Sequence, residues 1–336
     1  MRGIIRNLRR NKRTAFTVSA VGAVLLLGAV AGLSVDRPAR AALDWIALPQ
    51  VDFAFTQPQF ADIEDDMVDV ASASTLHNVL DDTGYALRKI RRGDVRVPRL
   101  FIESLPQDFD EQMVVEARKR TFIRTILPLI LKANEEVQFE RRRLIALEEQ
   151  LLSGRDVADD EQAWLNRISE KYDTAPGDIA ALLRRVDTVS PTLALAQAIE
   201  ESGWGRSRFA RAGNALFGQR AWSSGAGFVP EERAEGERFE VRAFDSLLDS
   251  VRSYVRNLNR HYAYEEYRVA RAQMRARDTQ LDARKLARTL VNYSERRDDY
   301  VNGLIGLINT NRLDDFEAAQ LSTEPFDLDA VQIASR

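Results

Sequence analysis

Apolar residues recur every three or four positions over much of the chain after residue 110, which is the spacing of one helix face. The longest run, residues 110–153, predicts a long helix that ends near Gly154, with a kink or a restart at Pro128. We expect this helix to supply core residues, and a partner-binding helix is the alternative. Shorter runs predict helices at 160–172, 175–185, 190–201, 245–261, 263–274, 282–291 and 298–309.

The period of the pattern changes to two between residues 228 and 243. Phe239, Val241 and Ala243 alternate with charged residues after a polar turn at 234–237, which predicts a small β-hairpin. The predicted fold class is therefore mainly α, with a helical domain at 111–312 into which one hairpin lobe is inserted. A cleft is expected where the two parts meet, and such clefts are common binding sites.

Residues 37–110 are predicted to form a stalk or linker, with a short helix near 74–90. Five prolines and an acidic patch at 62–66 interrupt this region, and such a composition is typical of spacers. After residue 312 the chain is acidic and irregular, so 313–336 are predicted to be a tail.

The start of the chain has the pattern of a membrane anchor. Residues 15–35 carry no charge, and about 20 apolar residues are enough to cross a bilayer. The six basic residues before them favour a cytoplasmic position for the first residues and export of the rest. We expect an uncleaved single-pass anchor within 1–36. A cleaved signal peptide is the alternative, with small-x-small sites at 29–31 and 39–41.

Composition narrows the chemistry that the exported part can perform. The 336 residues include 48 basic and 51 acidic ones, and the stretch after residue 36 alone has a net charge of −8. Such an acidic body argues against a general nucleic-acid binder. The absence of cysteine and the presence of only two histidines exclude thiolate and His-rich metal sites, so no metal and no cofactor is predicted. Carboxylates and tyrosines remain as the candidate catalytic groups.

One segment carries a distinctive arrangement of polar residues and glycines. The helix at 190–201 ends in Glu200 and Glu201, and Gly203 and Gly205 then flank Trp204. Neighbouring helix positions are about 100° apart, so only one of the two glutamates can face a given cleft. A carboxyl group beside apolar rings has a raised pKa, as a general acid for glycosidic cleavage requires. An ordinary helix end with a core tryptophan is the alternative interpretation.

The motifs at 201–205 and 213–218 resemble the signature of bacterial peptidoglycan N-acetylglucosaminidases of the flagellar-rod hydrolase and autolysin type. Supporting likenesses occur at 244–246, 293–294 and 300–301, and together they most resemble the Bax-like subfamily of cell-wall hydrolases. The resemblance covers about 115–312 and implies a lysozyme-like α+β fold. It also implies an endo-β-N-acetylglucosaminidase that cuts β-1,4 bonds of the peptidoglycan glycan strand. With the predicted anchor, this places the domain on the periplasmic side of a bacterial inner membrane.

The resemblance implies roles for particular residues. Glu201 would be the general acid, and Tyr293 would lie in the catalytic cleft close to it. Substrate-binding positions would be Trp204, Asn214, Phe217, Tyr300 and Glu240. The implied partners are glycan strands and, through the N-terminal segment, the membrane; no protein partner is indicated.

The second catalytic group remains open at the level of sequence. Two-carboxylate glycosidases need a second acid about 5–9.5 Å from the first, and Glu232 ranks first among the hairpin glutamates, followed by Glu240. The substrate's own N-acetyl group could replace it, and a lytic transglycosylase route would use a hydroxyl of the sugar. A glycan-binding module without catalysis is a further alternative.

Overall fold

The structure is a computed structural model that describes residues 67–110, 113–221, 227–229 and 240–326. All of these residues belong to one unit, Gln50–Arg336. The predicted membrane anchor and the last ten residues of the predicted tail lie outside the described residues. Among the residues that are described, no helix is both long enough and apolar enough to cross a membrane.

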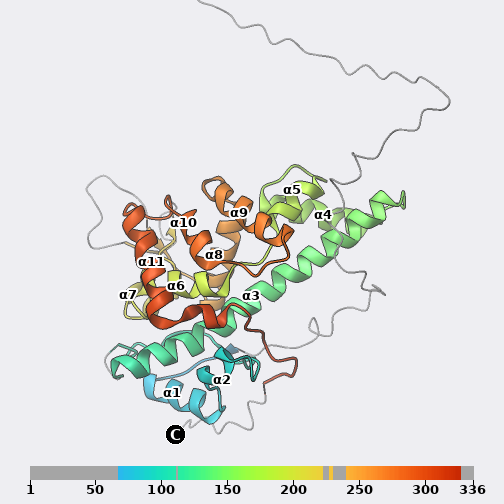
Figure 1. The fold of residues 1–336 in the computed structure, drawn as a ribbon. Helices are drawn as coiled ribbons and strands as arrows, with labels where there is room; N and C mark the ends of the chain where they lie inside the picture. Colours follow the sequence, from blue (N-terminus) through green and yellow to red (C-terminus); the bar gives the residue numbers. More distant parts are fainter. Residues whose placement is uncertain (1–66, 111–112, 222–226, 230–239, 327–336) are drawn as a thin grey trace, which may run out of the picture. The chain divides into compact units, whose positions relative to one another are not determined.

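The longest element is helix α3 (Val115–Leu152), drawn in green in Figure 1. Pro128 lies inside it without ending it, so the expected restart at this residue is wrong. A proline inside a helix costs about 3 kcal/mol, and burial of the side chains on both sides of Pro128 offsets that cost. Most of α3 between Thr121 and Val137 is buried, which confirms that this part of the helix supplies core residues.

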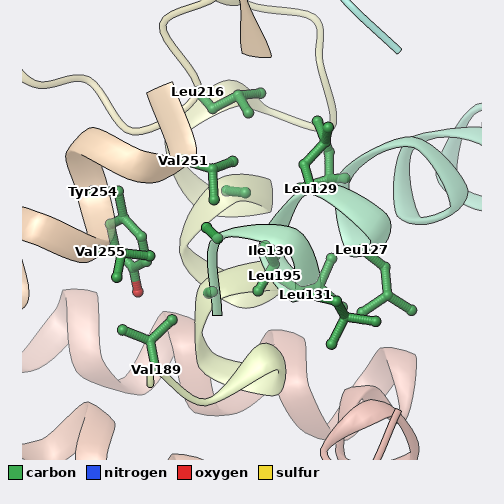
Figure 2. Close-up of a cluster of buried hydrophobic side chains, with 14 of the residues drawn as sticks. Leu127, Leu129, Ile130, Leu131, Val189, Leu195, Leu216, Val251, Tyr254 and Val255 are labelled. Atoms are coloured by element: carbon green, nitrogen blue, oxygen red, sulfur yellow. The ribbon is translucent and has the colours of Figure 1, made fainter. Parts of the chain in front are cut away.

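The core forms where α3 meets two other helices, α6 (Pro191–Ser202) and α8 (Leu247–Arg260). Their facing side chains interdigitate with Val189, which precedes α6, and with Leu216, which follows helix α7 (Arg208–Gly213) (Figure 2). The labelled members of this cluster are Leu127, Leu129, Ile130, Leu131, Val189, Leu195, Leu216, Val251, Tyr254 and Val255.

The other helices agree well with the apolar periodicity. The predicted cap of α6 is confirmed, because the Ser190 side chain accepts a hydrogen bond from the Leu193 N–H and Pro191 occupies the first turn. Helix α5 (Ile179–Arg185) begins later than expected because Asp178 caps it. The remaining helices are α4 (Asp159–Tyr172), α5 (Ile179–Arg185), α7 (Arg208–Gly213), α9 (Glu265–Ala276), α10 (Ala283–Arg288) and α11 (Asp298–Asn311), with 3₁₀ helices η2 (Tyr262–Tyr264) and η3 (Leu313–Phe316).

The predicted hairpin is part of a small antiparallel sheet. Strand β4 (Gly227–Phe228) pairs with β5 (Glu240–Arg242), and Phe228 lies opposite Val241. A strand that the sequence pattern did not indicate, β3 (Arg220–Ala221), pairs with the other edge of β5. The described part of the protein is thus mainly α with little sheet.

The expectation of a linker is wrong for residues 67–110, which are folded. They form α1 (Ala73–Asp82), α2 (Leu87–Arg91) and a parallel pair of strands, β1 (Met67–Val68) and β2 (Phe101–Ile102). Helix α1, blue in Figure 1, and β2 both contact α3. The short apolar stretches between the prolines pack against partners that are distant in sequence, so no local period reveals them.

The predicted tail also packs onto the fold as far as the structure describes it. Phe316 and Leu321 are buried. The Val97 N–H donates to the Gln320 carbonyl at 2.8 Å, and the Ser322 N–H donates to the Val97 carbonyl at 2.7 Å. The segments before and after the predicted domain therefore pair with each other.

The folded state of 67–110 gives a direct prediction. Phe109 is fully buried, and its ring lies so close to Gly205 that a Cβ there would come within 2.9 Å of the Phe109 Cε1. Phe109→Ala should lower the free energy of unfolding by about 3–5 kcal/mol in urea denaturation, since it opens a cavity. Val114→Ala, at a side chain that is 76% exposed, should change it by less than about 0.5 kcal/mol. Equal, small effects of both substitutions would contradict the packing of this segment.

Candidate active site

Glu201 lies in the last turn of α6. Every residue of this helix is buried except Glu200 and Glu201, which are half-buried. Gly203 then ends the helix with a left-handed backbone (φ 57°), as the sequence predicted for a glycine at this point. Burial of the rest of α6 fixes the direction in which the two carboxylates leave the helix.

The two adjacent glutamates have different partners. Glu200 accepts a hydrogen bond from the Arg296 guanidinium at 2.6 Å. Glu201 is hydrogen-bonded instead to the Tyr300 hydroxyl. Adjacent positions of a helix point about 100° apart, so the two carboxylates were predicted to face different surroundings.

A buried chain of polar groups leads to Glu201. The Tyr254 hydroxyl donates to Gln197 Oε1 at 2.7 Å, and Gln197 Nε2 donates to the Tyr300 hydroxyl at 2.9 Å. All three side chains are fully buried. Because Tyr300 accepts from Gln197, its own proton is left to donate to the Glu201 carboxylate. The chain thereby orients the tyrosine toward the acid.

Burial raises the pKa of the Glu201 carboxyl from its ordinary value of 4.5 to about 7. The hydrogen bond from Tyr300 and the charge of Arg296 act in the opposite direction, while the negative charge of Glu200 adds to the increase. The group is therefore partly protonated near neutral pH. A raised pKa was predicted from the sequence, but the aromatic neighbour that contacts the carboxyl group is Tyr300.

The loop at Phe217 and Gly218 covers the Glu201 carboxylate from another side. Gly218 has a φ of +58°, and a Cβ at this position would lie 3.3 Å from Glu201 Oε2. A larger residue would therefore face both backbone strain and a tight contact with the acid. Glycine permits the close approach of this loop to the carboxylate.

Tyr293 and Tyr300 lie side by side near Glu201. Their rings are stacked with centroids 5.5 Å apart and an interplanar angle of 6°. The half-buried Tyr293 donates its hydroxyl hydrogen to the Phe217 carbonyl at 3.4 Å. Burial raises the pKa of Tyr293, and the negative charge of Glu201 raises it further, so the phenol stays protonated.

Trp204 has contacts with α3. Its ring meets Phe122 edge-to-face at 6.0 Å, and Lys119 Nζ lies 5.4 Å from the ring centre. The backbone of Trp204 is left-handed (φ 61°), as are those of Gly203 and Gly205. The structure thus shows Trp204 securing the turn after α6, while its substrate contact stays a prediction.

Asn214 and Phe217 also hold the loop in place. The Asn214 side chain donates to the carbonyls of Phe244 and Asp245 at 3.1 and 3.2 Å. Phe217 is only 2% exposed, and its ring stacks on Tyr254 at 4.0 Å. A face covered in this way is not available to a sugar, so the expected substrate contact of the Phe217 side chain is replaced by packing.

The hairpin glutamates differ in what the structure shows of them. Glu240 is 7% exposed, and its carboxylate accepts a hydrogen bond from the Gly227 N–H at 2.9 Å, which ties β5 to β4. Glu232 lies outside the described residues, so its position as a second acid stays a prediction. In the described part of the chain, no group of three or more His, Cys, Asp or Glu side chains could hold a metal ion.

Sequence reasoning missed a second half-buried carboxyl group with a raised pKa, at the other end of α6. Glu317 Oε2 accepts hydrogen bonds from the Ser190 hydroxyl at 2.5 Å and from the Thr192 N–H at 3.3 Å. Burial raises the pKa of Glu317 to about 7. The residue follows η3 in the predicted tail, where its acidity resembled that of its exposed neighbours.

Comparison with known proteins identifies the family to which this chain belongs. Residues 177–313 match the model of the glucosaminidase family, described as mannosyl-glycoprotein endo-beta-N-acetylglucosaminidase. Protein bax of Escherichia coli (strain K12) is 32% identical over 201 residues, which cover 58% of this chain and 70% of that protein. The chain belongs to the Bax-like family of peptidoglycan glucosaminidases.

This family membership makes the chain a glycoside hydrolase directed at peptidoglycan. Among solved structures, the catalytic domain of the autolysin Auto from Listeria monocytogenes is 19% identical, with a TM-score of 0.30. The match covers 51% of this chain and 95% of that domain. The family model begins near α5, so α1 to α4 precede the matched region.

The raised pKa of Glu201 predicts how the stability of this glucosaminidase depends on pH. The folded state holds the Glu201 proton more tightly than the unfolded chain does, so wild type should lose stability as pH rises from about 4.5 to 7. Glu201→Gln removes this penalty and should raise the free energy of unfolding at pH 8 by about 1–3 kcal/mol. The gain should vanish at pH 4, where the carboxyl is protonated in both states.

Urea denaturation at both pH values measures the difference. Glu200→Gln is the matched control, because Glu200 is a partly exposed partner of Arg296. This substitution should not raise the free energy of unfolding at pH 8. A Glu201→Gln protein that is no more stable than wild type at pH 8 would show that the pKa of the Glu201 carboxyl is not raised.

Proposed function

We propose that this chain is an endo-β-N-acetylglucosaminidase that cuts β-1,4 bonds of the peptidoglycan glycan strand, with Glu201 as general acid. The observation that carries the proposal is the half-buried Glu201 carboxyl with a pKa raised to about 7. A lysozyme-like arrangement, with a cleft between the helical body and the small sheet, is part of the same proposal.

The Glu201 environment suits proton donation to a glycosidic oxygen. A general acid works best when its pKa lies near the working pH, because the group is then both protonated and ready to donate. As the bond between C1 and the glycosidic oxygen breaks, the Glu201 proton moves to the leaving oxygen. The Tyr300 hydroxyl, already oriented by Gln197, would stabilise the carboxylate that remains.

The proposal gives Glu232 the role of the second carboxylate. Its rival Glu240 already accepts a hydrogen bond inside the sheet, which makes it less free to reach the substrate. Separation of the two carboxyl groups by about 5–5.5 Å would imply retention of configuration, and about 6.5–9.5 Å inversion. Tyr293, stacked on Tyr300, is proposed to contact the sugar at the reaction centre, and Trp204 to border the cleft.

Digestion of purified sacculi by the full chain, with the products identified by mass spectrometry, tests the activity. We expect products that end in a reducing N-acetylglucosamine. Glu201→Gln should lower kcat/KM by about 10²–10⁴-fold, and activity should decline above pH 7 as the acid ionises. Glu200→Gln is the control and should keep most of the activity.

Three other results would contradict the proposal in different ways. Products with 1,6-anhydro ends would indicate a lytic transglycosylase. Binding of sacculi without release of fragments would indicate a glycan-binding module. Full activity of Glu201→Gln would remove Glu201 from the role of general acid.

We also propose that the chain is anchored in the bacterial inner membrane by residues within 1–36, with the enzyme domain on the periplasmic side. The uncharged stretch 15–35 and the six basic residues before it support this topology. A tethered hydrolase would act on the strands nearest the membrane.

The mass of the intact protein recovered from bacterial membranes tests the anchor. We expect a mass that includes residues 1–36, together with digestion of the domain by protease added to spheroplasts. A mature chain that begins near residue 32 or 42 would show that the segment is a cleaved signal peptide, and protection from the protease would contradict the orientation.

A further inference from the structure

An exposed aromatic pair lies at the turn between α8 and α9. Tyr262, the first residue of η2, is 82% exposed, and the ring of His261 beside it is exposed as well. The two rings are stacked with centroids 4.4 Å apart and an interplanar angle of 29°. The pair presents a flat apolar surface to solvent and is not part of the buried core.

A continuous series of ring contacts joins this pair to the catalytic site. His261 is 5.8 Å from Tyr264, Tyr264 is 5.9 Å from Tyr293, and Tyr293 is 5.5 Å from Tyr300, measured between ring centres. Tyr300 is the residue that is hydrogen-bonded to Glu201. We call these five residues, Tyr262, His261, Tyr264, Tyr293 and Tyr300, the ring row.

Charge effects place the middle of the ring row close to the acid. The negative charge of Glu201 contributes to raising the pKa of both Tyr264 and Tyr293, after the larger effect of burial. The row therefore extends outward from the reaction centre itself. Tyr264 and Tyr300 are buried and Tyr293 is half-buried, whereas the outer two residues are exposed.

Hydrogen bonds fix the backbone and the His261 ring at the outer pair. Arg268, which is 3% exposed, donates hydrogen bonds to the carbonyls of Leu258 at 3.0 Å and His261 at 2.9 Å. The His261 Nδ1 accepts a hydrogen bond from the Ala263 N–H at 3.2 Å. A surface ordered before binding loses little conformational entropy when a ligand arrives.

The chemistry of the pair matches that of a sugar. Tyrosine and histidine combine a flat apolar face with polar groups at the ring edge, as a pyranose combines apolar C–H groups with hydroxyls. Because Nδ1 of His261 acts as acceptor, the neutral ring carries its hydrogen on Nε2 and offers a donor at its edge. Tyr262 adds a hydroxyl group.

We propose that Tyr262 and His261 form an outer subsite, at which an N-acetyl amino sugar of the bound glycan strand stacks at a distance from the bond that Glu201 attacks. This inference rests on the proposed function. The outer subsite would favour long strands over short ones, because only a long strand reaches both the reaction centre and the exposed pair.

Cleavage of peptidoglycan glycan strands of graded length by the full chain tests the outer subsite. Tyr262→Ala should raise KM for long strands by about 3–10-fold with little change in kcat, as expected for the loss of one stacking contact. The shortest strands that are cleaved should be unaffected, because they do not reach Tyr262. Tyr262→Phe keeps the ring and should behave nearly as wild type does.

Phe139→Ala is the matched control, because Phe139 is an exposed aromatic residue of α3 outside the ring row. It should leave KM unchanged for every strand length. Equal kinetics of Tyr262→Ala and wild type on all lengths would overturn the outer subsite, and so would a KM effect as large on the shortest strands as on the longest.

The binding of long strands to Glu201→Gln, with and without Tyr262→Ala, separates this inference from the proposed function. Weaker binding on loss of Tyr262 supports the outer subsite even if wild type proves not to hydrolyse the strands. Hydrolysis that depends on Glu201 but is indifferent to Tyr262 would overturn the outer subsite and leave the proposed function standing.

Discussion

The burial of helix α6 is the constraint on which the site depends. Packed between α3 and α11, the helix leaves only Glu200 and Glu201 incompletely buried. A carboxyl group at the end of such a helix loses much of its hydration, and desolvation is the main cause of the raised pKa of Glu201. The raised pKa of Glu201 therefore comes from the packing of a whole helix.

Polar contacts fix the position of this helix at its N-terminal end. At its start, the Glu317 carboxyl accepts hydrogen bonds from Ser190 and Thr192. Before it, the buried Arg271 guanidinium donates to the carbonyls of Asp187 and Thr188 at 3.1 and 3.2 Å. Because an unpaired buried polar group is costly, these contacts allow little displacement of α6.

Residues that precede the region matched by the family model support the loop that follows Glu201. The Gln107 side chain donates to the Arg211 carbonyl at 2.9 Å, and Arg206 pairs with Asp110 at 2.8 Å. Phe109 packs on Gly205 in the turn that follows Glu201. The region before α3 thus supports the loop after α6, although the family model begins at residue 177.

The sequence alone determined the helices of the body and singled out the segment that carries Glu201. Helical periodicity depends on neighbours three and four positions away, and caps such as Ser190 act within one turn, so both are visible locally. The motif around Glu201 was distinctive because Gly203 and Gly205 favour the left-handed backbone of this turn.

Only the tertiary structure decided which rings surround Glu201 and which segments are folded. Trp204, adjacent in sequence, packs on α3, whereas Tyr300, distant in sequence, is hydrogen-bonded to the acid. Leu76 and Phe101 are fully buried within a stretch that has the composition of a spacer. The ring row from Tyr262 to Tyr300 likewise joins the turn after α8 to the segment around the start of α11. These features depend on contacts between residues far apart in the chain, and no local pattern encodes such contacts.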